Sequence, residues 1–363
     1  MLIGSACSGY DGLALGLIEA LGGGTVSWQA EVDPAANRIL ACRYPGTPNL
    51  GDITGVDWHQ VPDVDWLIAG YPCQPFSDSG HRKGTDDERH LWPHLAHGIR
   101  ILRPRFVLLE NVRGHLGRGF INVLNGLAAF GYVGSWACVR ASDVGAAHRR
   151  ERLFILAADA SRFRHRDSGS DFDAWLQACA VPGVDGPPAG SPPAADAVRN
   201  LTLFPSPRAS DYTGACLHGD GGPDLRTVAV TLLPTPRASD GEKGSPNQHG
   251  SSGDLMLSSA VQAQRWGAYG EAISRWEQVT GRPAPPATQQ WPGGQLVLSP
   301  TFVEWLMGLD DGFVTRAPRV TRNDALRVLG NGVVPLQAAR AVRILLPRLA
   351  ALLRLDSRCL AGL

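Results

Sequence analysis

The chain has 363 residues, of which 44% are apolar, so it is long enough for two domains and too apolar to be a disordered polymer. Its 34 basic and 34 acidic residues balance, and a formal charge of zero does not by itself suggest a nucleic-acid partner. No stretch approaches the roughly 18 consecutive apolar residues of a membrane span, and no signal peptide is expected. Seven cysteines, odd in number and never in CxxC spacing, argue against a disulfide framework or zinc site and for a reducing cytoplasm.

The basic residues are almost all arginine, because Lys83 and Lys243 are the only lysines. Arginine suits bidentate contact with phosphate, carboxylate and guanine edges, but a GC-rich genome gives the same bias, and we take that as the main cause. Formal charge is uneven along the chain, with −2 over residues 1–160, −2 over 161–295 and +4 over 296–363.

Residues 1–160 alternate apolar runs with helical patterns. The apolar runs predict buried strands at 2–6, 26–31, 65–69, 106–110 and 152–158. A leucine at every fourth position from Leu13 predicts a helix between the first two strands, and Asp33 before Pro34 predicts the capped start of another. The repeated strand–helix–strand order predicts an α/β fold with a doubly wound, mostly parallel sheet. Ligands of such sheets lie at the carboxyl ends of the strands.

Residues 161–295 have a different texture, with 17 Gly and 15 Pro that make long regular elements improbable. The segment Pro-Ser-Pro-Arg-Ala-Ser-Asp at 205–211 recurs as Pro-Thr-Pro-Arg-Ala-Ser-Asp at 234–240. Two copies are too few for a solenoid, so we interpret them as a duplicated loop-plus-helix unit.

Regular structure returns over residues 296–363. Ser299 is expected to cap a helix that begins at Pro300 and stops at Gly308. An apolar stripe over about 336–353 predicts a last helix that packs against the sheet.

A loop bounded by prolines follows the predicted strand 65–69. It reads Gly-Tyr-Pro-Cys-Gln-Pro-Phe-Ser over 70–77, and its prolines stiffen the turn that holds Cys73 at the carboxyl end of the strand. A thiolate there has the position of a nucleophile. Taken alone, a buried structural cysteine is the commoner situation.

Four motifs resemble those of the DNA cytosine-5 methyltransferase family. They are Pro-Cys-Gln at 72–74, Glu-Asn-Val at 110–112, His-Arg-Arg-Glu-Arg at 148–152 and Gly-Asn-Gly-Val-Val-Pro at 330–335. Their order and spacing are similar to the family's, and the resemblance covers the chain apart from its middle. It implies a Rossmann-like S-adenosylmethionine-dependent methyltransferase fold. Residues 1–160 would be the catalytic and cofactor-binding domain, 161–295 an irregular target-recognition region and 296–363 a C-terminal segment returning to the catalytic domain.

The resemblance also assigns the catalytic residues. Cys73 is the expected nucleophile, whose addition to C6 of cytosine makes C5 enamine-like. Glu110 is expected to engage N3 and the exocyclic amine. Arg150 and Arg152 would stabilise charge developing on the base or anchor a phosphate, with Arg152 favoured for the base. Ordinary surface positions are the alternative for both arginines.

The methyl donor, S-adenosylmethionine, would bind the first half of the chain and leave as S-adenosylhomocysteine; no metal is expected. Segment 7–12 resembles the family's Phe-x-Gly-x-Gly loop, with Cys7 in place of Phe and Asp11 in place of the second Gly. Glu31 and Asp52 match the acids that take the ribose hydroxyls and the adenine amino group, although either acid also suits a helix or turn cap. The expected donor-site residues are Cys7, Ser8, Gly9, Tyr10, Gly12, Leu13, Glu31, Asp52, Pro72, Leu91 and Asn331; for Trp92 a place in the core is an equal alternative.

Contacts with DNA are expected from two parts of the chain. The polar loop 78–89, which contains Ser79, is expected to close on DNA, and Gln74 and Ser77 precede it as further candidate contacts. The candidate base readers in the middle region are Arg208, Arg237, Lys243, Asn247 and Gln248, since arginine reads guanine and the amides read adenine. The repeated units are either duplicated DNA contacts or Arg–Asp pairs that hold two loops together.

These features imply an enzyme that methylates C5 of a cytosine flipped out of double-stranded DNA, because a stacked base cannot present C6 to a thiolate. Two alternatives stay open. One is an RNA cytosine-5 methyltransferase of the same fold. The other is a non-catalytic DNA-binding relic, which only the departures at Cys7 and Asp11 support and which Cys73, Glu110 and Arg152 argue against. A monomer in the cytoplasm of a bacterium or phage-infected host is expected. The sequence leaves open the target site and whether a cognate restriction endonuclease accompanies the enzyme.

Overall fold

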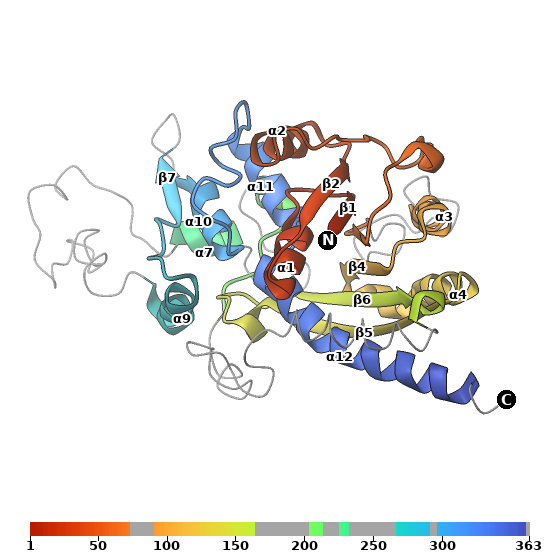
Figure 1. Ribbon diagram of the computed structural model, residues 1–363. Coiled ribbons are helices and arrows are strands. Elements are labelled where there is room, and N and C mark those ends of the chain that lie inside the picture. The colour runs from red at the N-terminus through yellow and green to blue at the C-terminus, as the bar shows by residue number, and fades with distance from the viewer. Residues whose placement is uncertain (73–90, 164–202, 213–224, 232–265, 291–295, 361–363) are drawn as a thin grey trace, which may run out of the picture.

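The computed structural model describes residues 1–72, 91–163, 203–212, 225–231, 266–290 and 296–360 (Figure 1). Several predicted functional residues lie outside this part of the chain: Cys73, Gln74, Ser77, Ser79, the loop 78–89, Arg237, Lys243, Asn247 and Gln248. In the described part, no helix has both the length and the apolar character that a membrane crossing requires.

A six-stranded sheet with the order β2-β1-β3-β4-β6-β5 forms the centre of the molecule. Strands β1 to β4 are parallel, whereas β6 runs antiparallel to both β4 and β5. The predicted doubly wound, mostly parallel α/β fold is therefore confirmed. The strands are β1 (Leu2–Ala6), β2 (Thr25–Ala30), β3 (Trp66–Ala69), β4 (Phe106–Val112), β5 (Tyr132–Arg140) and β6 (Glu151–Asp159).

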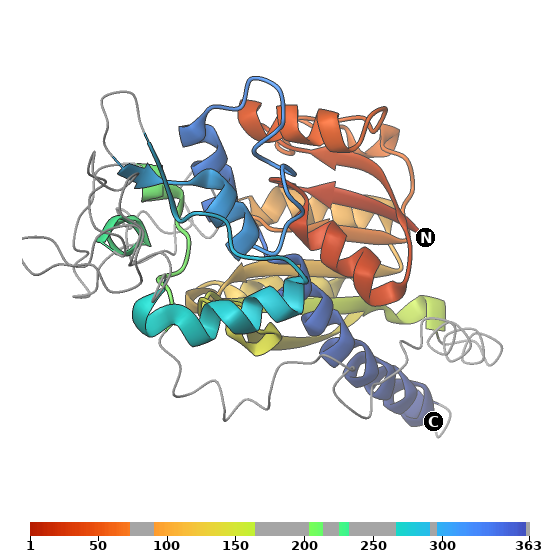
Figure 2. The ribbon, with the colours of Figure 1, turned by 90° about the vertical axis from the view of Figure 1, so that its left-hand side faces the viewer.

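Alternating strand residues send side chains to two apolar layers, one on each face of the sheet. On one face, Ile68 and Leu108 join the core formed with α1 (Gly12–Leu21) and α12 (Pro335–Leu360). On the other face, Leu67 and Val107 join the core formed with α3 (Trp92–Leu102) and α4 (Phe120–Ala129). Figures 1 and 2 show α12 running along the sheet beside α1, with α3 and α4 beyond the strands. The last helix thus packs on the sheet that the first part of the chain forms.

Elements from the middle and the C-terminal parts of the chain share a separate apolar cluster. Its centre holds Trp276, Phe302 and Phe204, each at most 2% exposed. The helices and strands of this part are α7 (Leu225–Thr231), α9 (Gly270–Thr280), β7 (Thr288–Gln290), β8 (Leu296–Leu298), α10 (Pro300–Leu306) and α11 (Arg322–Asn331). Short 3-10 helices are η1 (Trp58–Gln60), η3 (Arg113–Gly117), η4 (Ala141–Val144), η5 (Ala160–Phe163), η6 (Ala209–Tyr212) and η8 (Gly267–Tyr269).

The predicted helix starts agree with the structure in position and differ in one detail. Asp33 caps α2 (Pro34–Arg43), accepting hydrogen bonds from the backbone amides of Ala35 and Ala36 at 2.9 Å. Ser299 stands at the expected N-cap of α10, but its hydroxyl bonds the Thr301 hydroxyl at 2.7 Å and caps no backbone amide. The predicted cap was wrong in that respect, because a second hydroxyl in the first turn competes for the Ser299 side chain.

Candidate functional site

A cavity of about 810 Å³ opens at the carboxyl ends of the parallel strands. Its lining combines the segments that follow β1, β2 and β3 with the last residues of β4, Arg152 on β6, and residues of α11 and the turn after it. The chain leaves β1 toward β2 on one side and reaches β3 on the other, so the cavity lies where the direction of winding reverses. Ligands of open α/β sheets bind at such a switch point.

The loop after β1 approaches the cavity in an unusual backbone conformation. Cys7, Gly9 and Asp11 have φ values of 51°, 58° and 68°, in the left-handed region that favours glycine. The Glu31 carboxylate secures this loop by accepting a hydrogen bond from the Gly9 amide at 2.7 Å. Its other oxygen accepts from the amides of Val32 and Asp33 at 2.9 and 2.8 Å. Glu31 is therefore held rigidly at the edge of the cavity.

Cys7 lines the cavity as a neutral thiol. Burial raises its pKa to about 12, and the charges of Glu31 and Asp52 act in the same direction. The small Cys7 side chain gives no aromatic face here. Val32, which also lines the cavity and is 63% exposed, gives an apolar surface that the sequence did not single out.

Tyr10 supports the loop from behind. Its ring is fully buried, and its hydroxyl donates a 2.6 Å hydrogen bond to the Val333 carbonyl. Two glycines make this packing possible, because a Cβ on Gly332 would lie 1.8 Å from the Tyr10 ring and one on Gly12 would lie 2.1 Å from the Val333 oxygen. Unlike the other residues predicted for the loop, Tyr10 does not line the cavity.

Asn49 joins two segments of the cavity wall. Its side-chain oxygen accepts from the amides of Glu31 and Gly51 at 2.9 and 3.1 Å, and its amide donates to the Glu31 carbonyl at 3.1 Å. The neighbouring Asp52 is exposed and accepts from the Thr54 amide at 2.9 Å, which is the main cause of its lowered pKa. Asp52 therefore presents a charged carboxylate to the cavity. Pro72, Leu91 and Asn331 also line it, whereas Trp92 is buried in the core.

Glu110 and Arg152 form an ion pair beside the cavity. Arg152 Nε lies 3.0 Å from Glu110 Oε1, and the side chains are 18% and 9% exposed. Antiparallel pairing of β4 and β6 brings them together, since Val112 lies opposite Arg152. Burial raises the pKa of Glu110, while the charges of Arg152 and then Arg150 lower it, and the net direction is upward. The carboxyl group is thus poised to carry a proton more readily than an exposed glutamate.

The segment that leads to Cys73 is fixed by the middle residue of the Glu-Asn-Val motif. Asn111 is buried, and its side-chain amide donates a 3.2 Å hydrogen bond to the Tyr71 carbonyl. The Tyr71 hydroxyl lies 3.0 Å from His115 Nε2. Pro72, the last described residue before Cys73, lines the same cavity as Glu110 and Arg152.

Arg150 is placed differently from its expected role at the base or a phosphate. It is 3% exposed, and its guanidinium donates to the backbone carbonyls of Pro207, Gly330 and Gly332 at 2.8, 2.9 and 2.5 Å. Burial lowers its pKa to about 9, and the nearby Arg152 charge acts in the same direction. Arg150 thus joins the middle region to the 330–335 motif. Arg150 and Arg152 both belong to the 148–152 motif, and the sequence pattern alone could not separate their roles.

The first copy of the repeat, residues 205–211, packs against helix α11. A Cβ on Gly330 would meet the Arg208 backbone at 2.2 Å, so only glycine permits this approach. The buried Asp211 accepts a 2.8 Å hydrogen bond from the Arg208 amide and closes its own turn. For the first copy, this local hydrogen bond favours a role in holding loops together over a role in DNA contact, although the Arg208 side chain is exposed.

His148, which stands where the family has Gln, supports the same junction. Its ring is fully buried, and Nε2 lies 3.0 Å from the Leu306 carbonyl oxygen. Burial lowers its pKa to about 3, so the ring is neutral at physiological pH. The preceding residue, Ala147, pairs with the middle region, because its carbonyl accepts a 2.8 Å hydrogen bond from the Phe204 amide.

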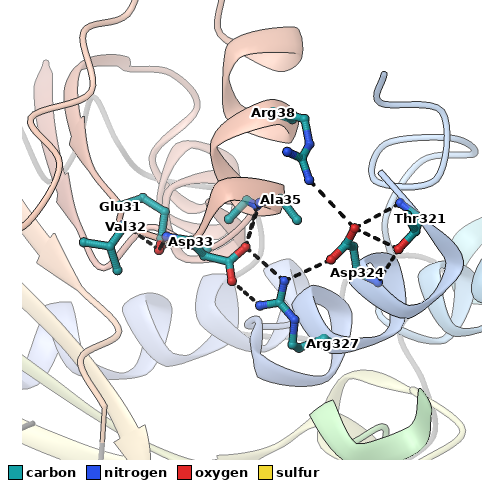
Figure 3. A network of polar contacts seen from close by, with 10 residues as sticks. Glu31, Val32, Asp33, Ala35, Arg38, Thr321, Asp324 and Arg327 are labelled. Atoms are coloured by element: carbon teal, nitrogen blue, oxygen red, sulfur yellow. Dashed lines mark hydrogen bonds and ion pairs between the residues drawn. The ribbon is translucent and has the colours of Figure 1, made fainter. Parts of the chain in front are cut away.

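Arg327 was missed by sequence reasoning although it lines the cavity. Figure 3 shows it between Asp33 and Asp324. Its guanidinium bonds both oxygens of Asp33 and lies 3.2 Å from Asp324 Oδ1. Arg38 approaches the other oxygen of Asp324 at 3.8 Å, and the Thr321 hydroxyl donates to that oxygen at 2.8 Å. The network fastens α11 to the start of α2. Only Asp33 was recognisable beforehand, as a cap, because its partner lies 294 residues away.

The site has the chemistry of an anchored small-molecule pocket beside a buried acid–base pair. Within the described residues, no group of three or more His, Cys, Asp or Glu side chains is arranged to hold a metal ion.

The six-stranded sheet and the cavity at its switch point define a Rossmann-like methyltransferase fold. The fold is similar to that of the S. pombe Dnmt2 methyltransferase, with a TM-score of 0.52 and 16% identity over 96% of this chain and 99% of that one. It is also similar to an E. coli prophage protein described as a DNA modification methyltransferase, with a TM-score of 0.51 and 19% identity over 94% and 97% of the two chains.

Sequence comparison finds similar proteins for the first part of the chain. Residues 1–173 match the family described as C-5 cytosine-specific DNA methylase. The Type II methyltransferase M.NlaIV of Neisseria lactamica is 33% identical over 167 residues, which are 42% of this chain and 40% of the relative. M.NgoMIV of Neisseria gonorrhoeae is 35% identical over 156 residues, or 42% and 49% of the two chains. The predicted resemblance to this family is therefore confirmed over residues 1–173, and the chain spans less than half the length of these relatives.

Proposed function

We propose that the protein transfers a methyl group from S-adenosylmethionine to C5 of cytosine in double-stranded DNA. The observation that carries this proposal is the Glu110–Arg152 ion pair, which faces the same cavity as the loop after β1 and as Pro72, the neighbour of Cys73. Methyl transfer to a bound base requires that the methyl donor and the groups that act on the base lie side by side, and this cavity brings them together.

The cavity suits S-adenosylmethionine in size and in polar groups. Its volume of about 810 Å³ falls in the usual range for small-molecule sites. Glu31 and Asp52 would hold the ribose hydroxyls and the adenine amino group, and Val32 would lie against the flat purine. When bound, S-adenosylmethionine supplies an electrophilic methyl group and becomes S-adenosylhomocysteine. The 330–335 motif closes the cavity through Asn331 and Gly332.

The protein's own residues would prepare the base. The Cys73 thiolate forms a bond to C6 and pushes electron density toward C5, while Glu110 donates a hydrogen bond or proton at N3. Arg152 holds Glu110 and stabilises negative charge that develops on the base. After C5 has gained the methyl group, loss of its proton restores the double bond and expels the thiolate from C6. The raised pKa of Glu110 favours the protonated form that the addition to C6 needs at N3.

Double-stranded DNA is the proposed substrate, because the middle region gives the chain a long segment available for reading flanking sequence. The target cytosine must leave the helix, at a cost of a few kcal/mol in pairing and stacking. We extend to this chain the Type II role that the matched relatives carry in their names, with a monomer as the acting species and a restriction endonuclease as a potential partner.

The test is expression of wild type, Cys73→Ala and Cys42→Ala in a host without cytosine methylation, followed by mapping of 5-methylcytosine in DNA and RNA. Cys42 is an exposed cysteine and serves as the matched control. We expect a sequence-specific mark in DNA from wild type and Cys42→Ala that is lost in Cys73→Ala. A mark found only in RNA would select the RNA alternative, and no mark from soluble wild type would select the relic.

A trapping experiment separates the covalent step from methylation itself. Duplex DNA with 5-fluorocytosine at the mapped position, incubated with S-adenosylmethionine, should form an adduct that survives denaturation, because after methyl transfer fluorine cannot leave C5 as a proton does. Tight DNA binding without an adduct would contradict the assignment of Cys73 as nucleophile.

A further inference from the structure

Asp11 stands where the family's loop has its second glycine, and the proposed reaction gives it no task. It has φ 68° and ψ 29°, directly before α1, and makes no capping hydrogen bond with its side chain. Aspartate is one of the few residues besides glycine that adopt this left-handed conformation at modest cost. The substitution therefore preserves the backbone path and adds a carboxyl group, which is 1% exposed.

The added carboxyl group joins two neighbouring strands. Ser5 Oγ donates to Asp11 Oδ1 at 2.6 Å, and Gln29 Nε2 donates to Oδ2 at 2.8 Å. Ser5 lies on β1 and Gln29 on β2, one residue before the end of each strand, and both are buried. Each oxygen of Asp11 thus receives a hydrogen bond, and the ends of the two strands are tied at a single residue.

From these partners the contacts reach the cavity wall. Ser5 lines the cavity, and its carbonyl accepts a 2.9 Å hydrogen bond from the Ser8 hydroxyl. The Gln29 backbone accepts from Leu50 at 2.7 Å and donates to Pro48 at 2.9 Å, which fixes the segment leading to Asp52. Three wall segments, at 5–9, 29–31 and 50–52, are therefore connected through Asp11.

Electrostatics favour strong bonds at this position. Burial raises the pKa of Asp11 to about 6, the hydrogen bonds from Ser5 and Gln29 act in the opposite direction, and the Glu31 charge raises it further. At neutral pH the group is ionised, so its hydrogen bonds are charge-assisted. Tyr44 is a further titratable neighbour, and burial and the Asp11 charge both raise its pKa.

We propose that Asp11 is a positioning residue of the methyl-donor pocket, replacing the family's glycine and clamping the ends of β1 and β2 so that the pocket is formed before the donor arrives. Preorganisation of this kind increases affinity because less ordering is needed on binding. This inference rests on the proposed function, since it assumes that the cavity takes S-adenosylmethionine.

The test measures binding of S-adenosylhomocysteine by calorimetry to wild type, Asp11→Gly and Asp11→Asn, well below each unfolding temperature. Asp11→Gly restores the family residue and relaxes the backbone, yet we expect about tenfold weaker binding because the clamp is lost. Asp11→Asn keeps the shape and can still accept from Ser5, so we expect recovery to within about threefold of wild type. Arg319→Gly, an exposed left-handed position with φ 59° outside the cavity, is the matched control and should bind as wild type does.

The outcomes separate this inference from the proposed function. Equal affinity in wild type and folded Asp11→Gly would overturn the inference, as would a loss explained by the unfolded fraction in a parallel melting curve. Asp11→Asn as weak as Asp11→Gly would also contradict it, because the conservative variant should rescue binding. If wild type itself failed to bind S-adenosylhomocysteine, the proposed function would fall first and the inference with it.

Discussion

Glu110 combines a buried carboxyl group with a close cation, Arg152, at 3.0 Å. Its raised pKa means that the folded protein binds a proton at this group more tightly than the unfolded chain does. Any stability that the group contributes is therefore present at low pH and is lost as pH rises through the raised pKa. The buried Glu110 carboxyl group therefore lowers stability at neutral pH, while its raised pKa suits it to act as a proton donor in the proposed reaction.

Replacement of this acid should separate activity from stability. We expect Glu110→Gln to lower kcat at least a hundredfold, since a general acid typically contributes that much. The unfolding free energy of wild type relative to Glu110→Gln should fall as pH rises, because only wild type has the buried acid to ionise. Parallel kcat and melting measurements against pH would check this. Glu19→Gln, which alters an exposed acid 3.3 Å from Arg343, is the control and should leave both profiles unchanged.

Single residues also show what could be read from the sequence and what could not. The motifs located Glu110 and Arg152, because both stand at strand ends whose apolar runs were visible. The different use of Arg150 was hidden, since its partner carbonyls lie 57, 180 and 182 residues away. Tyr10 was expected in the pocket with its loop neighbours, but whether a loop side chain points in or out depends on backbone angles that a motif does not state.

At the scale of elements, the donor pocket depends on how α11 is held against the start of α2. Arg327 bonds both oxygens of the Asp33 cap and also approaches Asp324, so one guanidinium joins two helices and the cavity wall (Figure 3). The Arg327 and Asp33 side chains are 31% and 25% exposed. A bidentate and partly buried pair of this kind is stronger than an exposed one.

A double-mutant cycle between Arg327→Met and Asp33→Ala should therefore show coupling of about 1–2 kcal/mol in unfolding free energy. Binding of S-adenosylhomocysteine should weaken in both single variants, because the segment with Glu31 and Val32 loses its support. The Arg316–Asp311 pair is the control, with side chains 72% and 62% exposed, and its cycle should give nearly zero. Coupling equally small at Arg327 would show that the network does not fasten the helices.

The elements predicted best were those with simple patterns. Buried parallel strands such as β3 and β4 read as short apolar runs, and α2 carried its own cap signal. Strand β5 was not predicted, because its burial is irregular: Tyr132 and Ser135 are buried while Trp136 is 45% exposed at the sheet edge. Helix α12 extends to Leu360, beyond the predicted end near 353. Its length could not be predicted from the apolar stripe alone.

For the whole molecule, the neutral formal charge conflicts only superficially with a DNA substrate. Zero net charge describes long-range steering, whereas binding depends on where the cations are placed. Several arginines are already committed inside the fold, including Arg150 to backbone carbonyls and Arg327 to Asp33. Arg43 likewise donates to the carbonyls of Phe313 and Gly312. The count of 34 basic residues therefore overstates the cations available to phosphates.

Because several arginines are bonded inside the fold, DNA binding should depend only weakly on salt. Each phosphate contact adds about 0.9 to the slope of log K against log salt for duplex DNA, so few contacts give a shallow slope. We expect a slope well below ten in magnitude and modest non-specific affinity, with specificity supplied by the middle region and the flipped base. Titrations of a labelled duplex between about 50 and 200 mM salt would measure it, with and without the mapped target site. A slope near ten on non-specific DNA would mean that the described fold commits far fewer arginines than its hydrogen bonds indicate.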